Sequence, residues 1–178
     1  MAHVATFGFP VPTVHEARGA DLVLERLDGP TMLSAFVAGD LDPAEGALQL
    51  ADLHRRLHQL PARLGQDADV RILHMDLHPD NVMLTARGPV VIDWRNATEG
   101  SADLDVAMTA VILAQVAVDE AHSLVSSARE LLKAFLDVVD GEPRSALDEA
   151  VAVRRADPAL TSDEVSRLDA AAAVIRGR

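Results

Sequence analysis

The second half of the chain carries apolar residues at helical spacing. Residues 107–118 are almost wholly apolar, which predicts a helix buried on all sides. In the following segment five large apolar residues share one helical face: Leu124, Leu131, Leu132, Phe135 and Leu136. A capping-box pattern at Thr161–Glu164 predicts the start of a later helix. The C-terminal part of the molecule is therefore predicted to be mostly helical.

The first half of the chain alternates turns with shorter apolar patterns. Leucines at positions 50, 53, 57 and 60 recur every three or four residues, which predicts a helix from Asp42 to Pro61. Three short strands are predicted, at residues 22–27, 82–85 and 90–93, and the last two form a hairpin through residues 86–89. Strands in the first half and helices in the second give an α+β fold class.

The densest run of polar side chains is His74–Asn81, which lies just before the predicted hairpin. The hairpin would fold Asp93 back toward this loop, beside Asn81. Carboxylate and amide oxygens suit Mg²⁺, which takes few protein ligands and shares the rest with phosphate oxygens and water. Asp76 adds a carboxylate that can accept a proton from an attacking hydroxyl. These are the groups that metal-assisted phosphoryl transfer requires.

Composition narrows the classes of function. The 178 residues carry 16 Lys and Arg against 28 Asp and Glu, a net charge of −12, which argues against nucleic acid as a partner. The lack of cysteine excludes disulfides, thiolate metal sites and cysteine nucleophiles, and suits a reducing, cytoplasmic compartment. Residues 1–10 have no signal-peptide pattern and no long apolar run follows, so neither export nor a membrane partner is predicted.

Several ordered motifs resemble those of one family. The segment His74–Asn81 (HMDLHPDN) is similar to the catalytic loop of kinases, and in this form it resembles the aminoglycoside phosphotransferase-like family. Val91–Trp94 resembles that family's metal-binding segment. Three further segments resemble its hinge strand, the helix before its catalytic loop and the start of its next helix: Leu22–Gly29, Leu50–Pro61 and Gly100–Ala107. The resemblance runs from about Phe7 to Ala107 and implies a protein-kinase-like fold.

The resemblance implies a transferase, with ATP and Mg²⁺ as cofactors. Such a small-molecule kinase, or phosphotransferase, moves the γ-phosphoryl group of ATP to a hydroxyl of a small molecule. Asp76 would be the catalytic base, and Asn81 and Asp93 would hold Mg²⁺ against the nucleotide phosphates. The Glu25 carbonyl and the Leu27 N–H would bind the edge of the adenine ring.

The resemblance also implies supporting roles and a division of the chain. His74 would support the loop, and Asp105 would anchor it through backbone hydrogen bonds. Residues 1–29 would be an N-lobe remnant with the hinge, and residues 30–178 a mostly helical C-lobe with a small catalytic hairpin. No Gly-rich loop precedes the hinge strand and the only lysine, Lys133, lies in the helical part, so a weak or inactive kinase is expected. The surface left by the missing N-lobe is expected to promote self-association.

Two other functions fit the sequence. One is a non-catalytic fragment or pseudokinase that acts by binding alone. The other is a metal-dependent hydrolase that uses His74, Asp76 and His78. The acceptor of a kinase is not indicated by any motif, although acidic runs such as Asp163-Glu164 would suit a cationic acceptor, for example an amino sugar.

One histidine pair has the spacing of a zinc-chelating helix face. His54 and His58 are four residues apart in the predicted helix. The residues between them include two arginines and no glutamate, and cationic neighbours disfavour a bound cation. Packing in the core is therefore the preferred interpretation of both histidines.

Overall fold

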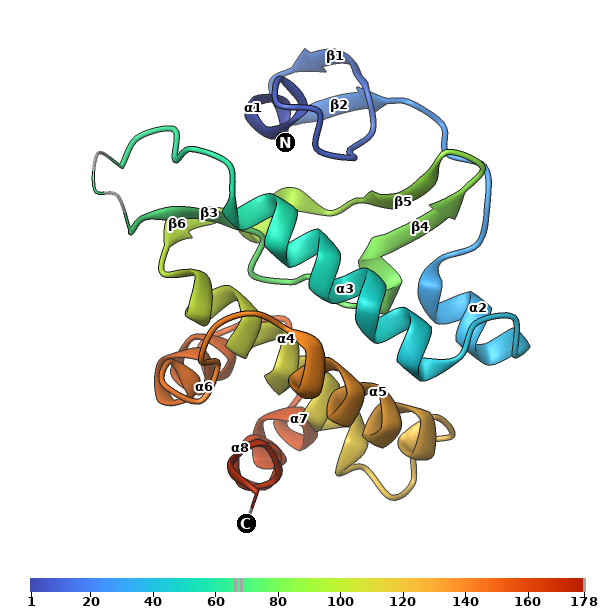
Figure 1. Ribbon diagram of the computed structural model, residues 1–178, viewed down its shortest axis with the longest axis vertical. Coiled ribbons are helices and arrows are strands. Elements are labelled where there is room, and N and C mark those ends of the chain that lie inside the picture. The colour runs from blue at the N-terminus through green and yellow to red at the C-terminus, as the bar shows by residue number, and fades with distance from the viewer. Residues whose placement is uncertain (66, 68, 178) are drawn as a thin grey trace.

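Figure 1 shows the computed structural model of the chain, in which residues 1–65, 67 and 69–177 are described. Its helices are α1 (Ala2–Ala5), α2 (Met32–Ala38), α3 (Pro43–His58), α4 (Ala102–Ala117), α5 (Val125–Val138), α6 (Leu147–Arg155), α7 (Ser162–Ser166) and α8 (Leu168–Arg176). Its strands are β1 (Val14–Arg18), β2 (Asp21–Leu24), β3 (Arg71–Leu73), β4 (Val82–Thr85), β5 (Gly88–Val91) and β6 (Thr98–Gly100). Two short 3₁₀ turns, Pro79–Asn81 and Trp94–Asn96, complete the described elements.

Helix α4 lies at the centre of the helical part. Most of its residues are buried, as its apolar sequence predicts. Helices α5, α6 and α8 pack against it, and α5 also packs against α3 (Figure 1). On α5 the side chains of Leu131, Leu132 and Phe135 are buried. Leu124 is the N-cap of this helix and Leu136 is half-buried, so two of the five predicted core residues lie at its margin.

The predicted start of α3 is confirmed and its predicted end is corrected. Asp42 Oδ1 accepts the N–H of Glu45 at 2.9 Å, which satisfies a free donor in the first turn. The helix ends at His58 rather than at Pro61. The N–H of Leu60 bonds three residues back, so the chain leaves the α-helix through a tighter turn before the proline.

The C-terminal segment forms two helices in place of the one expected. The predicted capping box is present, with Thr161 and Glu164 bonding each other's backbone at the start of α7. Helix α7 ends at Ser166, and α8 begins at Leu168. None of the described helices has the length and apolar character needed to cross a bilayer.

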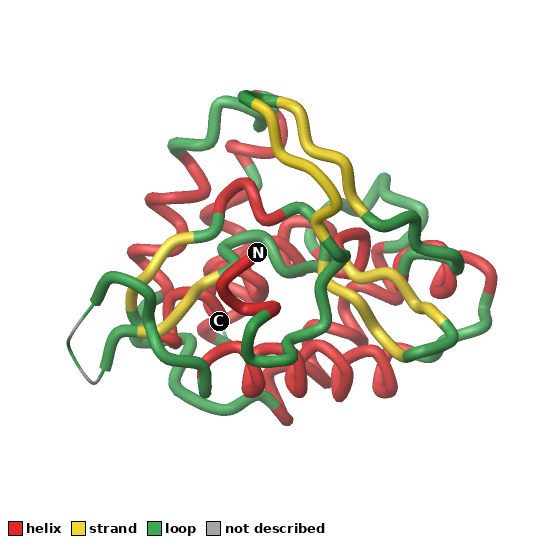
Figure 2. The backbone as a smooth tube through the Cα atoms, turned by 90° about the horizontal axis from the view of Figure 1, so that it is seen from above, coloured by secondary structure: helices red, strands yellow, loops and turns green. Residues whose placement is uncertain are grey.

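The described strands form three separate antiparallel pairs: β1–β2, β3–β6 and β4–β5. Figure 2 shows these pairs at different places above the helices. The predicted catalytic hairpin is confirmed, but its second strand, β5, spans Gly88–Val91 rather than residues 90–93. Gly88 has φ +103, which glycine adopts at little cost, and this allows a turn of two residues between Thr85 and Gly88.

The strand predicted at residues 22–27 is shorter than expected. Strand β2 ends at Leu24 because its partner β1 begins at Val14, which lies opposite that residue. The following segment then crosses to the β4–β5 hairpin. Gly29 has φ +136, and a Cβ there would collide with the carbonyl of Leu84 on β4. The segment after β2 therefore lies directly on β4.

Candidate functional site

The loop His74–Asn81 follows β3 and is held from α4. Asp105, which is fully buried, accepts the His74 N–H at 3.1 Å through Oδ2 and the Met75 N–H at 2.6 Å through Oδ1. Met75 has φ 65, in the left-handed region that side chains disfavour. The two bonds from Asp105 stabilise this backbone. The predicted anchoring role of Asp105 is therefore confirmed.

His74 connects the loop to the hairpin. Its Nε2–H donates to the Ile92 carbonyl at 3.0 Å, and its ring meets Trp94 edge-on with 4.8 Å between centroids. Burial lowers the pKa of His74, so the ring is neutral at neutral pH. These contacts agree with the supporting role expected for His74.

Asp76 and Asn81 are joined across the loop. The side-chain amide of Asn81 donates through Nδ2 to the Asp76 carbonyl at 2.8 Å and lies 3.3 Å from the carboxylate Oδ2. His78 Nδ1 accepts the Asp80 N–H at 3.3 Å and caps the turn that carries Asn81. The Asp76 side chain is 13% exposed, so it is not fully closed off from solvent. Because Asn81 uses its nitrogen toward Asp76, its Oδ1 is the atom that a metal ion would take.

The hairpin brings Asp93 back to the loop, as the sequence predicts. Val82 pairs with Val91, and the Ile92 N–H donates to the Asn81 carbonyl at 3.0 Å. Asp93 follows directly, exposed and with φ 53, another left-handed residue that is not glycine. Such strained positions cluster at functional sites. Asp93 and Asn81 are thus neighbours at the exposed end of the hairpin.

Glu25 and Leu27 lie away from this cluster, on the segment that leaves β2. The Glu25 carboxylate pairs with Arg87 at 2.8 Å and accepts the Thr13 N–H at 3.0 Å. The hydrogen bond from Arg87 is the main reason that the pKa of Glu25 is lowered to about 2. Among the described residues, no hydrogen bond or ion pair joins Glu25 or Leu27 to Asp76. Their expected contact with adenine stays a prediction.

Arg154 on α6 is a candidate that no sequence pattern indicates. Its Nη1 lies 3.8 Å from Asp76 Oδ1 and 3.4 Å from Asp157 Oδ2, and its Nε donates to Gln115 Oε1 at 3.0 Å. Burial lowers the pKa of His78, and the charge of Arg154 acts in the same direction. The contact between Arg154 and Asp76 exists only because α6 packs against α4.

Two cavities meet at Arg154. One, of about 260 Å³, is lined mainly by apolar side chains of α4 and α5 together with His78. The other, of about 510 Å³, lies between the loop and α6 and is lined in part by Met75 and Met108. Both cavities therefore share a lining residue that lies 3.8 Å from the carboxylate of Asp76. They are the candidate spaces for a small molecule.

The set His74, Asp76 and His78 lacks the geometry of a metal centre. The His74 ring is engaged with Ile92 and packs against Trp94. In the described part of the chain, the one group of three ligand atoms within 4.8 Å of one another lies elsewhere. The hydrolase interpretation therefore has no supporting metal site in these three residues.

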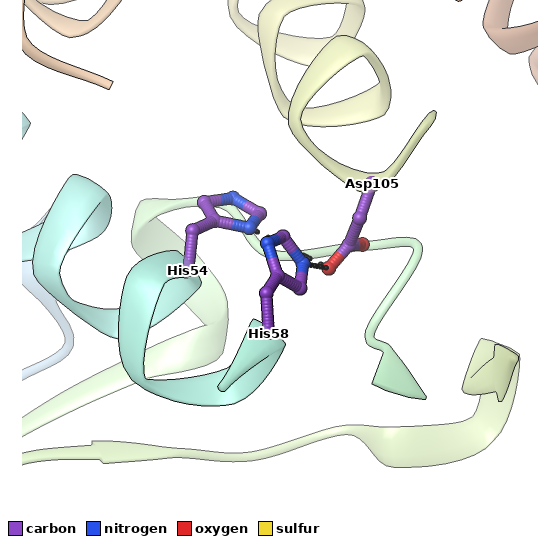
Figure 3. A group of neighbouring side chains, drawn as sticks. All are labelled: His54, His58 and Asp105. Carbon is purple, nitrogen blue, oxygen red and sulfur yellow. Dashed lines mark hydrogen bonds and ion pairs between the residues drawn. The ribbon is translucent and has the colours of Figure 1, made fainter. Parts of the chain in front are cut away.

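That group consists of His54 and His58 on α3 and Asp105 on α4 (Figure 3). His54 and Asp105 are fully buried, and His58 lies at the surface end of the group. Burial lowers the pKa of His54. Burial opposes the ionisation of Asp105, but the hydrogen bond from His58, at 2.9 Å, acts in the opposite direction and the pKa of its carboxyl lies well below its usual range. Both histidines are in the core or at its edge, as predicted.

Comparison with known proteins adds a family and a fold. The model of the phosphotransferase enzyme family matches residues 15–123. Thiamine kinase of Salmonella paratyphi B is 44% identical over 55 residues, which are 30% of this chain and 20% of that kinase. Thiamine kinase of Salmonella newport matches to the same extent. The matched segment is thus about a fifth of the length of these curated relatives.

Two solved structures resemble almost the whole chain. Amicoumacin kinase hAmiN, in complex with AMP-PNP, Ca²⁺ and Ami, has a TM-score of 0.51 at 15% identity, over 99% of this chain and 75% of that chain. A choline/ethanolamine kinase family protein from Mesorhizobium loti has a TM-score of 0.51 at 14% identity, over 98% of this chain and 76% of that chain. At this level of identity the likeness is one of fold.

Proposed function

Because the chain belongs to the phosphotransferase enzyme family, we propose that it transfers the γ-phosphoryl group of ATP to a hydroxyl of a small molecule. Its fold is protein-kinase-like, with a mostly helical lobe and a small hairpin beside the loop. The observation that most supports this function is the meeting of Asp76, Asn81 and Asp93. The kinase solved with AMP-PNP and Ca²⁺ supports a nucleotide and a divalent cation as ligands.

Asp76 is the proposed catalytic base. Its carboxylate accepts the proton of the acceptor hydroxyl while the hydroxyl oxygen forms a bond to the γ-phosphorus. The bond from that phosphorus to the bridging oxygen breaks, and ADP leaves with the electron pair. A hydrogen bond from Asn81 holds the Asp76 backbone in place. The acceptor hydroxyl would reach the partly exposed side chain of Asp76.

Asn81 and Asp93 are the proposed ligands of Mg²⁺. An amide oxygen and a carboxylate oxygen are hard donors, which this ion prefers, and Asp93 is exposed beside Asn81. Two protein ligands leave the other positions to phosphate oxygens and water, as in other magnesium-nucleotide sites. When bound, the ion neutralises charge on the phosphates.

Residues 1–29 are proposed to form the nucleotide side of the site, and residues 30–178 the helical lobe. The Glu25 carbonyl and the Leu27 N–H are the proposed partners of adenine. The Glu25 carboxylate is engaged with Arg87, which holds this segment on the catalytic hairpin and supports the proposal. The segment would therefore move with the hairpin that carries Asp93.

The acceptor is proposed to bind beside Arg154. The guanidinium there is flanked by the carboxylates of Asp76, at 3.8 Å, and Asp157, at 3.4 Å. These carboxylates offset its charge, so Arg154 does not oppose a cationic acceptor.

The proposal is tested by measuring nucleotide binding and transfer separately. Millimolar Mg-ATP should raise the Tm of the full chain, and Asp93→Asn should reduce that rise. With a panel of hydroxyl compounds, at least one should raise the rate of ADP release above the rate without acceptor. The absence of any Tm rise would contradict the proposal. Binding without acceptor-stimulated ADP release would favour a protein that acts by binding alone.

A further inference from the structure

The His54, His58 and Asp105 group has a feature that packing alone does not explain. Thr109 Oγ1 donates its only proton to the Leu77 carbonyl at 2.7 Å. The same oxygen lies 2.9 Å from His54 Nε2, so it must accept a hydrogen bond from the Nε2–H group. The neutral His54 ring therefore carries its proton on Nε2 and a lone pair on Nδ1.

That lone pair faces a carboxylate. His54 Nδ1 is buried and has no hydrogen-bond partner among the described residues. Its nearest charged neighbour is Asp105 Oδ2, at 3.5 Å. A neutral imidazole nitrogen of this kind and a carboxylate oxygen are both acceptors, so they repel each other in a buried site where the dielectric constant is low. A cation between them would convert this repulsion into two favourable bonds.

We propose that His54 Nδ1, His58 Nε2 and Asp105 Oδ2 bind one Zn²⁺ ion, with water as the fourth ligand. The three atoms lie within 4.8 Å of one another (Figure 3). Two imidazole nitrogens and a carboxylate oxygen form a ligand set typical of zinc, which prefers four tetrahedral ligands. This site is separate from the proposed Mg²⁺ ligands and does not depend on the proposed function.

The surroundings provide the outer shell that such a site needs. Metal-bound histidines usually donate their second N–H to a fixed acceptor, and His54 Nε2–H donates to Thr109, which in turn donates to Leu77. A cavity of about 230 Å³, lined by both histidines, by Asp103 and by Asp140, gives an ion access and leaves room for the water ligand. Arg55 also lines this cavity, so two carboxylates and one guanidinium surround an incoming cation.

Binding requires His58 Nε2 to be free of its proton. His58 Nε2 now lies 2.9 Å from Asp105 Oδ2 and donates its proton there. To bind Zn²⁺ through Nε2, His58 must lose that proton or carry it on Nδ1. Of the two arginines between the histidines, Arg56 lies over the Phe9 ring at 5.8 Å from its centroid, and Arg55 lines the cavity but pairs with Asp52. The charge of Arg55 is therefore partly offset by that carboxylate.

The ion would lie beneath the loop that carries Asp76. Asp105 also holds the backbone of His74 and Met75, so a metal on its Oδ2 would join α3, α4 and the base of the loop. Its role is structural, since it stabilises the folded chain and contacts neither nucleotide nor acceptor. Zn²⁺ should therefore raise the Tm of the protein in the absence of ATP.

The test uses the full chain, stripped of metal with a chelator and titrated with ZnCl₂ by calorimetry. We expect one ion per chain and a Tm that rises with Zn²⁺. Loss of a residue that only hydrogen-bonds to a metal ligand weakens metal binding by about 10- to 100-fold. His58→Gln removes a ligand itself, so it should weaken Zn²⁺ binding by about 100-fold or more. The side-chain amide that this substitution introduces can still donate to Asp105, which keeps the loop anchored. His15→Gln, at an exposed histidine of β1, is the matched control and should bind as the wild type does.

Two further measurements keep the assignment specific. Co²⁺ in place of Zn²⁺ should give the strong visible absorption of tetrahedral coordination in the wild type and not in His58→Gln. Asp93→Asn should leave Zn²⁺ binding unchanged, whether or not the chain has kinase activity. Weak binding that is equal in the wild type and His58→Gln would overturn the proposal. Loss of Zn²⁺ binding in Asp93→Asn would also overturn the proposal, because the ion would then be bound at the proposed Mg²⁺ ligands.

Discussion

Besides His78, whose Nε2 lies 3.7 Å from its carboxylate, two residues from different parts of the chain contact Asp76. The Asn81 amide bonds its backbone, and the Arg154 guanidinium lies 3.8 Å from its side chain, held in turn by Gln115. The first contact fixes the position of Asp76 within its loop. The second brings a positive charge from a helix far along the chain to the place where an acceptor would bind. A single carboxylate thus has its position set locally and its electrostatic surroundings set by the tertiary fold.

The substitution Asp76→Asn should separate catalysis from nucleotide binding. Asparagine has nearly the same shape but cannot accept the hydroxyl proton, so acceptor-dependent ADP release should fall by about 10²- to 10⁴-fold. Mg-ATP should raise the Tm of the variant as much as that of the wild type, because Asn81 and Asp93 are retained. Asp40→Asn, at an exposed aspartate after α2, is the control. An unchanged release rate, or a loss of the Tm rise, would count against Asp76 as the base.

Residues within one motif could be predicted from the sequence, and those contributed by distant helices could not. The loop and hairpin are local in sequence, so the nearness of Asn81 and Asp93 follows from strand pairing alone. The anchoring by Asp105 was predictable only through family resemblance. Arg154 was missed because its contact depends on how α6 packs, and no local pattern records that packing.

At the scale of elements, strands β1, β3 and β6 were not predicted from the sequence, and β6 shows the reason most clearly. Thr98, Glu99 and Gly100 show no apolar alternation, and their partner β3 lies far away in the chain. The pair is nevertheless reinforced by a side chain. The Glu99 carboxylate accepts the N–H groups of Arg63, Leu64 and Gly65, the closest at 2.6 Å. Glu99 therefore ties the segment after α3 to the strand pair below the loop.

The hydrogen bonds that the Glu99 carboxylate accepts should be sensitive to acid. Hydrogen bonds from Gly65, and then from Arg63 and Leu64, lower the pKa of Glu99 below its ordinary value of 4.5. A carboxyl whose pKa is lower in the folded state than in the unfolded state stabilises the fold. This stabilisation is complete above the pKa of the unfolded state, and it is lost as the pH falls through the pKa of the folded state. Amide hydrogen exchange at Leu64 and Gly65, compared with that of α4, should therefore increase as the pH is lowered below about 4.

Glu99→Gln provides the check on that assignment. The amide keeps the shape and one acceptor oxygen but cannot titrate. Exchange at Leu64 and Gly65, relative to α4, should then be faster than in the wild type at pH 7 and should lose its acid dependence. Glu16→Gln, at an exposed residue of β1, should leave the exchange rate at pH 7 and its acid dependence unchanged. An acid dependence that persists in Glu99→Gln would show that another group opens the segment.

The whole molecule depends on one helical core beneath the site. Helix α5 packs against both α3 and α4, and these two helices supply the cluster that holds the loop. The amphipathic and apolar patterns predicted these helices well, because burial of one face or of all faces leaves a periodic signal. They did not predict which helices touch, since that depends on the loops and on the three short strand pairs above them.

Phe135 lies where these helices meet, so Phe135→Ala should destabilise the whole chain. The side chain is fully buried on α5, with its ring centroid 5.8 Å from that of His54 on α3. Its removal should lower the free energy of unfolding in urea by about 3–5 kcal/mol, and Phe7→Ala, at a side chain 49% exposed, by about 0.5 kcal/mol or less. Because α3 and α4 hold the loop, the Mg-ATP response should disappear in the same transition that unfolds the helices. A small effect of Phe135→Ala, or a nucleotide response that outlasts helix unfolding, would mean that the site folds independently of this core.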